Sequence, residues 1–132
     1  MALGETIGEV RGKVAGLRAL EDGRIEITLQ GKGKLLGDDI GDVTSFWSEF
    51  RPNGTAYGEG HSMQLGSDGI AEWKGSGVGK PTGPGAWKYA YGGAYRKATS
   101  QKWARLLGVY VVGEYQSDAE GNYQWKLWEW KY

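Results

Sequence analysis

Hydrophobic and polar residues alternate along most of this chain, as they do in β-strands that bury one face. In the stretch RIEITLQGKGKLL, polar side chains take every second position from Arg24 to Lys34. Ile25, Ile27 and Leu29 lie between them. The alternation predicts a sheet with one face in water and the other in a core.

Eight stretches with strand signals follow one another, and turn sequences such as EDGR, RPNGT, GSDG and DAEGN separate several of them. The predicted strands cover roughly residues 6–20, 24–37, 40–51, 55–65, 70–79, 85–96, 108–117 and 122–131. Short links favour antiparallel neighbours, and eight long strands in a meander close most naturally into a barrel without edges. We therefore expect an all-β fold, an eight-stranded antiparallel up-and-down barrel that forms a single domain over residues 1–132.

One segment, TSQKWARLLG, departs from the alternation. Trp103, Leu106 and Leu107 recur at helical spacing, Thr99 or Ser100 can cap the start, and Gly108 can end the helix. We predict one short helix near residues 99–107. A helical crossover between two strands is the preferred interpretation, and a plug over one end of the barrel is the alternative.

Glycine and aromatic residues are unusually frequent, with 24 glycines, seven tryptophans and eight tyrosines. Because they are interleaved at the strand period, the glycines indicate a packed sheet in which missing side chains make room for rings. At the C-terminus, YQWKLWEWKY changes its alternation near Leu127. The sequence leaves open whether this strand is bulged or carries one aromatic set outward, where it would form a contact between copies of the chain.

Charge and composition exclude several classes of function. Sixteen basic and sixteen acidic residues cancel, so no basic surface favours nucleic acid or an anionic membrane. The absence of cysteine and the single histidine exclude the common transition-metal sites, and we expect no metal and no cofactor. Without a signal peptide or an apolar run long enough to span a bilayer, a cytoplasmic protein is expected.

The single histidine lies in YGEGHSMQL, and the turn RPNG before it fixes the pairing of its strand. A type I turn with a glycine bulge pairs Arg51 with Thr55. That pairing places five side chains on one face: Trp47, Glu49, Tyr57, Glu59 and His61.

The turn GSDG after this strand decides which face is inside, because a shift by one residue reverses every side chain. A three-residue loop sets Met63 opposite Trp73 and turns His61 inward. A two-residue loop groups Ser62 and Gln64 with Trp73 and turns His61 outward. We expect the inward arrangement, with the outward one as the alternative.

In the inward arrangement, Glu59 and His61 would occupy a lumen of low dielectric and act as general acid and base. The remaining candidates would contact a ligand: Trp47, Glu49, Tyr57, Met63, Trp73 and Glu114. The alternative is a polar network that fixes the core, or plain surface residues.

The glycine-punctuated strands, with YGEGHSM, AEWKGSGVGKPTGPG, ARLLGVYVVGEYQSDAEGN and a C-terminal WEWK, resemble a group of small, uncharacterised bacterial and archaeal barrel proteins. The resemblance is to calycin-like barrels of the allene oxide cyclase type and covers residues 30–131. It implies an apolar cavity open at one end, which in that class binds lipids or polyketide-like molecules and in some members cyclises them. No catalytic set of that class is matched in this sequence.

Three hypotheses follow. The first is a barrel that binds an apolar small molecule and supports isomerisation or cyclisation of a lipid- or polyketide-like substrate by holding one conformer. The second is a non-catalytic carrier or sensor with the same cavity. The third is a structural or oligomerising barrel filled by its own aromatic residues, with Phe46 and Phe50 exposed at a contact between copies. Whether the protein is an enzyme stays open at this stage.

Overall fold

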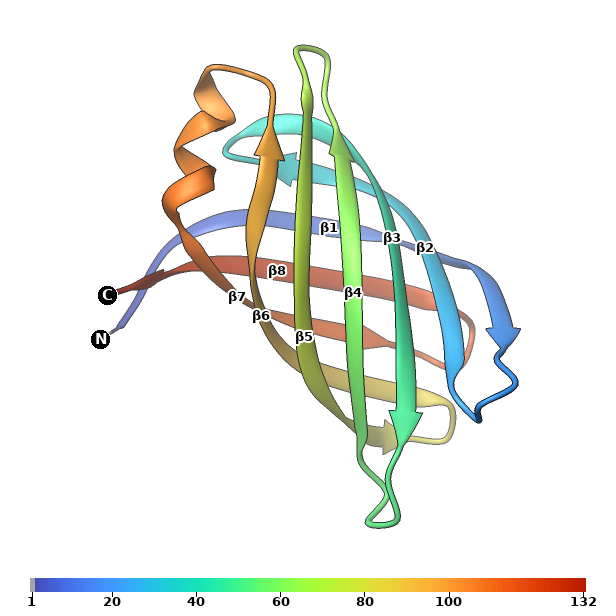
Figure 1. Cartoon of the computed structure of the whole chain (residues 1–132). Helices are drawn as coiled ribbons and strands as arrows, with labels where there is room; N and C mark the ends of the chain where they lie inside the picture. Colours follow the sequence, from blue (N-terminus) through green and yellow to red (C-terminus); the bar gives the residue numbers. More distant parts are fainter. Residues whose placement is uncertain (1) are drawn as a thin grey trace.

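The structure is a computed structural model, and it describes residues 2–132. Eight strands and one short helix follow one another along the chain (Figure 1). The strands are β1 (Ala2–Ala19), β2 (Ile25–Leu35), β3 (Asp38–Phe50), β4 (Ala56–Leu65), β5 (Ile70–Gly83), β6 (Ala86–Ala98), β7 (Tyr110–Ser117) and β8 (Asn122–Lys131).

Each strand pairs in antiparallel fashion with the next one, and β8 returns to pair with β1. This closure leaves no unpaired edge, which is why long strands rich in aromatic residues remain safe from edge-to-edge association. The predicted eight-stranded antiparallel up-and-down barrel is therefore confirmed.

The short helix η1 (Lys102–Gly108) lies between β6 and β7, at the upper end of the barrel in Figure 1. It is a 3₁₀ helix, and Ser100 Oγ accepts a hydrogen bond from the backbone N–H of Trp103 at 3.1 Å. Trp103 and Leu106 are buried, and the Trp103 ring packs against Gly66 in the β4–β5 turn. The helix thus covers this end of the lumen besides connecting two strands.

The pairing of β3 with β4 is the one that the RPNG turn predicts. Arg51 N–H donates to the Thr55 carbonyl at 2.8 Å, and Gly54 supplies the positive φ of 86° that the turn requires. Ser45 lies opposite His61 in the resulting register. The shared face of Trp47, Glu49, Tyr57, Glu59 and His61 follows from that register.

That shared face points outward, and the predicted inward arrangement is wrong. Gly66 N–H donates to the Gly69 carbonyl at 2.9 Å, so the turn closes over two residues, Ser67 and Asp68. Ser62 consequently pairs with Trp73, and the buried face of β4 consists of Ala56, Gly58, Gly60, Ser62 and Gln64. Glycine is needed on this face because a Cβ on Gly58 would lie 2.7 Å from the Trp47 carbonyl oxygen, and one on Gly60 would lie 2.6 Å from Phe46 Cβ.

The C-terminal strand carries one aromatic set inward and one outward. Tyr123, Trp125 and Leu127 are buried in the core, while Trp128 and Trp130 are half-buried on the opposite face. The register irregularities lie where the N-terminal part of β1 meets β8. Both alternatives left open by the sequence therefore apply, an outward set on β8 and a bulged pairing with β1.

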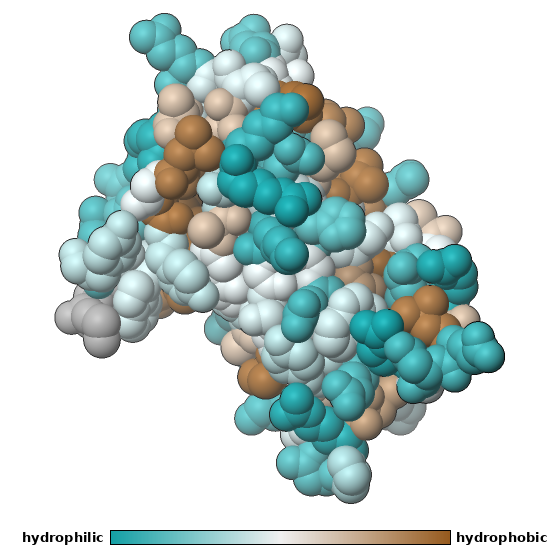
Figure 2. Space-filling model, in the orientation of Figure 1, coloured by the Kyte–Doolittle hydropathy of each residue, from teal (hydrophilic) through white to brown (hydrophobic). Residues whose placement is uncertain are grey.

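The outer wall has a mixed surface. In Figure 2 hydrophobic residues form separate brown patches among teal and white ones, without one continuous apolar area on the face shown. Phe46 lies inside against the core, while Phe50 is 53% exposed and packs on Trp87 with ring centroids 5.5 Å apart. The hypothesis of a filled barrel expects Phe46 and Phe50 to be exposed at a contact between copies of the chain. Only Phe50 is exposed and thus available for such a contact.

Candidate functional site: the lumen

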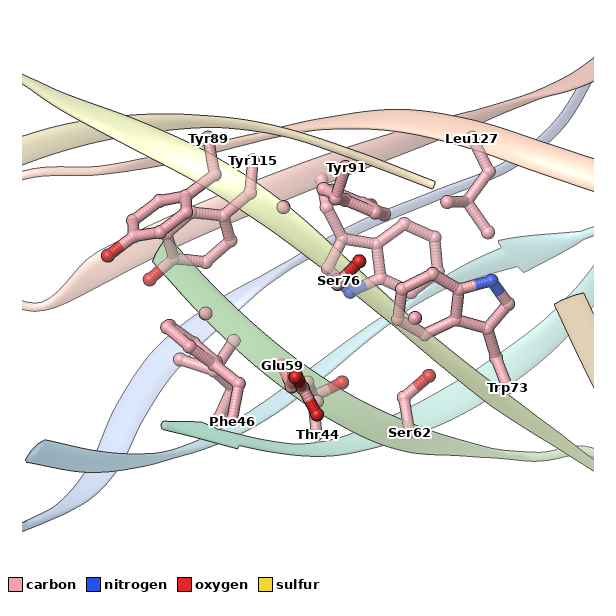
Figure 3. A pocket seen from close by; sticks show the side chains of 16 residues that line it. Thr44, Phe46, Glu59, Ser62, Trp73, Ser76, Tyr89, Tyr91, Tyr115 and Leu127 are labelled. Atoms are coloured by element: carbon pink, nitrogen blue, oxygen red, sulfur yellow. The ribbon is translucent and has the colours of Figure 1, made fainter. Parts of the chain in front are cut away.

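The lumen holds a cavity of about 70 Å³. Its wall is almost entirely apolar, and Figure 3 shows aromatic rings converging on it from several strands. The large side chains of the wall include Leu29, Phe46, Trp73, Tyr91, Trp125 and Leu127. A cavity with so apolar a lining favours an apolar occupant over water.

Glycines and rings position one another around the cavity. The Tyr91 ring covers Gly113 and the Trp73 ring covers Gly75, so a Cβ on either glycine would meet a ring. Trp73 and Tyr91 meet edge to face at 5.3 Å and 72°, a favoured geometry for aromatic pairs. The glycines of the strands thus leave space on the inner face, and the aromatic rings pack into that space.

Three further rings close the cavity on the side away from the helix. Phe46, Tyr89 and Tyr115 contact one another edge to face, with centroids 5.6–5.8 Å apart. The Tyr89 hydroxyl is fixed by a hydrogen bond of 2.7 Å to Ser48 Oγ. Access from this end of the barrel requires these rings to move.

A buried carboxylate, Asp42, lies in the lumen next to the cavity wall. It accepts hydrogen bonds from Gln64 Nε2 at 3.0 Å, Tyr123 OH at 2.9 Å and Trp125 Nε1 at 3.1 Å. Thr44 Oγ1 adds a fourth donor at 3.1 Å. With its oxygens engaged in this way, Asp42 is a structural acceptor that orients Trp125 in the cavity wall.

Burial changes the acidity of the groups in the lumen. It raises the pKa of Asp42, although the hydrogen bonds from Gln64, Tyr123 and Trp125 oppose that shift. Burial also raises the pKa of Tyr115 to about 12 and that of Tyr91 well above its usual value. The phenols therefore remain neutral donors at physiological pH.

One polar atom of the lumen lacks a partner. Trp73 Nε1 is buried and has no hydrogen-bond acceptor, and it is the only such buried side-chain atom among residues 2–132. An unsatisfied buried donor costs about 1–3 kcal/mol of folding free energy. Trp73, the residue with this unpaired donor, is also one of the residues that line the cavity.

Most of the residues selected from the sequence lie on the outer wall instead. Tyr57 OH donates to Glu59 Oε2 at 2.8 Å, and the Trp47 and Tyr57 rings meet edge to face at 5.8 Å. Arg24 and Arg51 stack over these two rings at 4.6 and 5.1 Å from their centroids. Glu59 is also among the residues that line the cavity. Its carboxylate, however, accepts the hydrogen bond from Tyr57 on the outer wall.

The other selected residues are spread around the barrel. His61 and Glu49 are exposed, and Met63 is half-buried on the same outer face. Glu114 lies on the outside of β7, 4.0 Å from Lys88 Nζ. Trp73 alone points into the lumen, so the structure does not bring the predicted set together; the catalytic roles of Glu59 and His61 stay predictions.

Sequence reasoning missed Asp42 and its partners. Asp42 alternates with Ile40, Thr44 and Phe46 along β3, so the outward arrangement of His61 would have placed it inside. Three of its four donors come from β4 and β8, and no local pattern predicts a contact between residues 42 and 125.

Within residues 2–132 no cluster of three histidine, aspartate or glutamate residues is arranged to hold a metal ion. No helix in that part of the chain has the length and hydropathy needed to cross a bilayer.

No family model matches the chain, and no curated protein matches its sequence. Solved structures do match its fold. A protein with unknown function from Clostridium acetobutylicum has a TM-score of 0.79 at 15% identity, covering 99% of this chain and 100% of its own. A conserved protein of unknown function from Rhodopseudomonas palustris has a TM-score of 0.76 at 13% identity, with 98% and 97% covered.

A β-barrel-like protein from Acinetobacter baumannii is similar too, with a TM-score of 0.78 at 13% identity over 98% of this chain and 96% of its own. Such low identities show the fold alone. The fold and the site thus define a small β-barrel protein with an apolar lumen. The resemblance to uncharacterised barrel proteins is supported, and its allene oxide cyclase-type part is not confirmed.

Proposed function

We propose that this barrel binds one small apolar molecule in its lumen and acts as a carrier or sensor for it. The observation that carries the proposal is the apolar cavity of about 70 Å³ between Phe46, Trp73 and Tyr91. Apolar ligand sites are typically concave, aromatic-lined and largely preformed, as this one is.

Binding is favoured over turnover by the chemistry of the wall. Acid–base catalysis needs a titratable group within hydrogen-bond reach of the ligand. The carboxylate nearest the cavity, Asp42, already accepts from four side chains, and Glu59 accepts from Tyr57 on the outer wall. Isomerisation or cyclisation of a lipid- or polyketide-like substrate would require a second conformation of these groups.

Size limits the ligand. A cavity of about 150 Å³ holds benzene, and this one has about half that volume. The expected ligand therefore has few non-hydrogen atoms, unless the rings of Phe46, Tyr89 and Tyr115 move apart.

The test is a thermal-unfolding screen with apolar compounds smaller than benzene, such as xenon, cyclopropane and isobutene. A ligand at a hundred times its dissociation constant adds about 2.7 kcal/mol to the stability, which raises Tm visibly. Leu127→Phe fills the cavity and should abolish the shift, whereas Leu107→Phe, on an exposed residue, should keep it. A shift that persists in Leu127→Phe, or no shift with any compound, would contradict binding in the lumen.

A second candidate is a barrel whose lumen is filled by its own side chains and whose partners bind the outer wall. The small cavity volume favours it, because side chains alone can fill an eight-stranded barrel. It predicts no thermal shift with any compound in the screen and a stable protein without ligand.

A further inference from the structure

The outer wall carries an apolar surface that has no part in the lumen. It spans the neighbouring strands β6, β7, β8 and β1, of which β1, β7 and β8 lie behind β3, β4 and β5 in Figure 1. Residues directly opposite one another on paired strands share a face, so the strand registers define two adjacent rows. One row is Ala94, Tyr110, Trp130 and Leu3, and the other is Gly92, Val112, Trp128 and Thr6. These two rows, here called the apolar face, contain no charged residue.

Large side chains of the apolar face are in contact with water. Tyr110 is 45% exposed and Leu3 is 55% exposed, while Trp128 and Trp130 are half-buried. The Tyr110 ring lies over Gly92, where an added Cβ would be 3.1 Å from Tyr110 Cε2. The centre of a protein–protein interface is typically depleted of charges and rich in aromatic residues, as this face is. The apolar face therefore has the composition of a surface that binds another protein.

The charged row beside the apolar face is complementary to itself. Glu114 on β7 lies directly opposite Lys126 on β8. A twofold axis in the plane of contact, parallel to these strands and midway between them, places β7 of one copy on β8 of the other. Glu114 of each copy then faces Lys126 of the other copy. The same axis brings Tyr110 onto Trp130 and Val112 onto Trp128, so that aromatic and aliphatic groups meet in the centre.

The charges of the chain favour a second copy over other partners. Sixteen basic and sixteen acidic residues cancel, so two copies do not repel one another as strongly charged proteins do. A partner of one sign, such as nucleic acid or an anionic membrane, would be attracted by one member of the Glu114 and Lys126 row and repelled by the other. Only a partner with both signs in the matching order is attracted by both.

We propose that two copies of this chain associate through their apolar faces, related by a twofold axis that runs between β7 and β8. Glu114 and Lys126 set the orientation of the pair, because only this arrangement joins each carboxylate to an ammonium group. The inference does not depend on the proposed function, since the apolar face lies outside the lumen.

Sedimentation velocity of the whole chain at increasing micromolar concentrations tests the association. The native protein should form a dimer, and Val112→Glu, which places a charge in the centre of the apolar face, should be monomeric over the same range. Val43→Glu is the matched control, because Val43 is an exposed residue of β3, on the opposite side of the barrel. It should dimerise as the native protein does. A monomeric native protein, a higher oligomer, or a dimer that survives Val112→Glu would overturn the proposal.

Charge reversal tests the twofold arrangement. In Glu114→Lys both contacts between copies join two lysine side chains, and in Lys126→Glu both join two glutamates. Each variant alone should associate about tenfold or more weakly than the native protein. A mixture of the two variants should recover the dimer, because every contact of the mixed pair joins a lysine to a glutamate.

The mixing experiment also remains decisive if Val112→Glu does not fold. The side chains of Glu114 and Lys126 are 51% and 43% exposed, so the two charge variants should keep the native Tm. Mixing changes neither chain, so a recovered dimer cannot come from contacts within one copy. Single variants that dimerise as tightly as the native protein, or a mixture that stays as weakly associated as its components, would refute the twofold arrangement.

Discussion

Gln64 Nε2 on β4 donates a hydrogen bond of 3.0 Å to Asp42 Oδ1 on β3, inside the barrel. The same amide nitrogen is 3.0 Å from Ser62 Oγ, and the amide oxygen accepts from Tyr95 OH. Gln64 thereby connects Asp42 to β6 through Tyr95. This polar network crosses a lumen that is otherwise apolar, so it fixes the relative positions of strands that hydrophobic contacts alone would hold less specifically.

Removal of the Asp42 carboxylate should destabilise the fold strongly. Asp42→Ala leaves the donors of Gln64, Tyr123 and Trp125 without their acceptor, with an expected cost of about 3 kcal/mol or more. Urea denaturation measures it. Asp39→Ala is the matched control on the same strand, because Asp39 is exposed and its ion pair with Lys34 is worth under about 1 kcal/mol. Equal losses in the two variants would contradict the structural role of Asp42.

The ionisation of Asp42 should make the free energy of unfolding depend on pH. Its folded-state pKa is raised by burial above the usual 3.8, so the folded protein holds this proton more tightly than the unfolded chain does. The stabilising contribution is therefore complete below the unfolded pKa and is lost as pH rises through the folded pKa. The stability of the native protein relative to Asp42→Asn should fall over that interval, measured by urea denaturation at successive pH values. A rise would show that the hydrogen bonds outweigh burial.

Asp118, in the β7–β8 turn, should behave in the opposite way. Asn122 Nδ2 and the backbone N–H groups of Glu120 and Asn122 donate to its carboxylate at 2.9 Å, and these bonds lower the pKa of Asp118. Its contribution is present above the unfolded pKa and is lost as pH falls through the lowered one. Carbon NMR titration should place the Asp118 midpoint below that of Asp42, and the reverse order would refute both assignments.

Glycine inside the lumen should be intolerant of any side chain. Gly75→Ala would place a methyl group into the Trp73 ring and the Gly92 carbonyl, with an expected loss of about 1–3 kcal/mol or more. Gly41→Ala, on the outer face of β3, meets nothing within 4 Å and should be neutral or slightly stabilising. Thermal unfolding of the two variants compares them, and a neutral Gly75→Ala would show that Trp73 has room to move.

The end of the barrel under the helix should depend on one ring. Trp103 is 2% exposed, and its Nε1 donates to Asp38 Oδ2 at 3.1 Å. Trp103→Ala should cost about 3–5 kcal/mol, while Leu107→Ala, on a residue that is 51% exposed, should cost under about 0.5 kcal/mol. Hydrogen exchange at the β4–β5 turn should rise in Trp103→Ala alone. Unchanged protection there would mean that the helix does not seal this end.

Changes on the outer wall should leave binding in the lumen intact. Glu59→Gln and His61→Ala alter groups outside the cavity, so the dissociation constant of a lumen probe should change by less than about twofold. Isothermal titration with a compound that raises Tm in the thermal-unfolding screen measures this, and Leu127→Phe provides the comparison that should abolish binding. A large effect of His61→Ala would restore the idea of a site that includes this face.

Local patterns were sufficient for the architecture. Alternation gave the strands, turn residues gave their antiparallel order, and the RPNG turn gave the register in which Ser45 faces His61. These features depend on neighbours in the chain, since strand geometry and turn geometry are set within a few residues. The glycine and aromatic content also indicated a lumen packed with rings, as Trp73 over Gly75 illustrates.

Only the tertiary structure decided which face of the strands is inside. Phe46 and Trp47 are adjacent on β3, and both faces of that strand carry an aromatic ring, so hydrophobicity did not distinguish them. The choice depends on rings of β6 that need the space above glycines of β5 and β7, as Tyr89 over Gly79 and Tyr91 over Gly113 show. The site follows the same logic, because Asp42 meets Trp125 across 83 positions of sequence and Trp73 Nε1 is unpaired only by virtue of what surrounds it. Closure of the barrel determines the contacts between distant strands, and these contacts cannot be predicted from the sequence of a single strand.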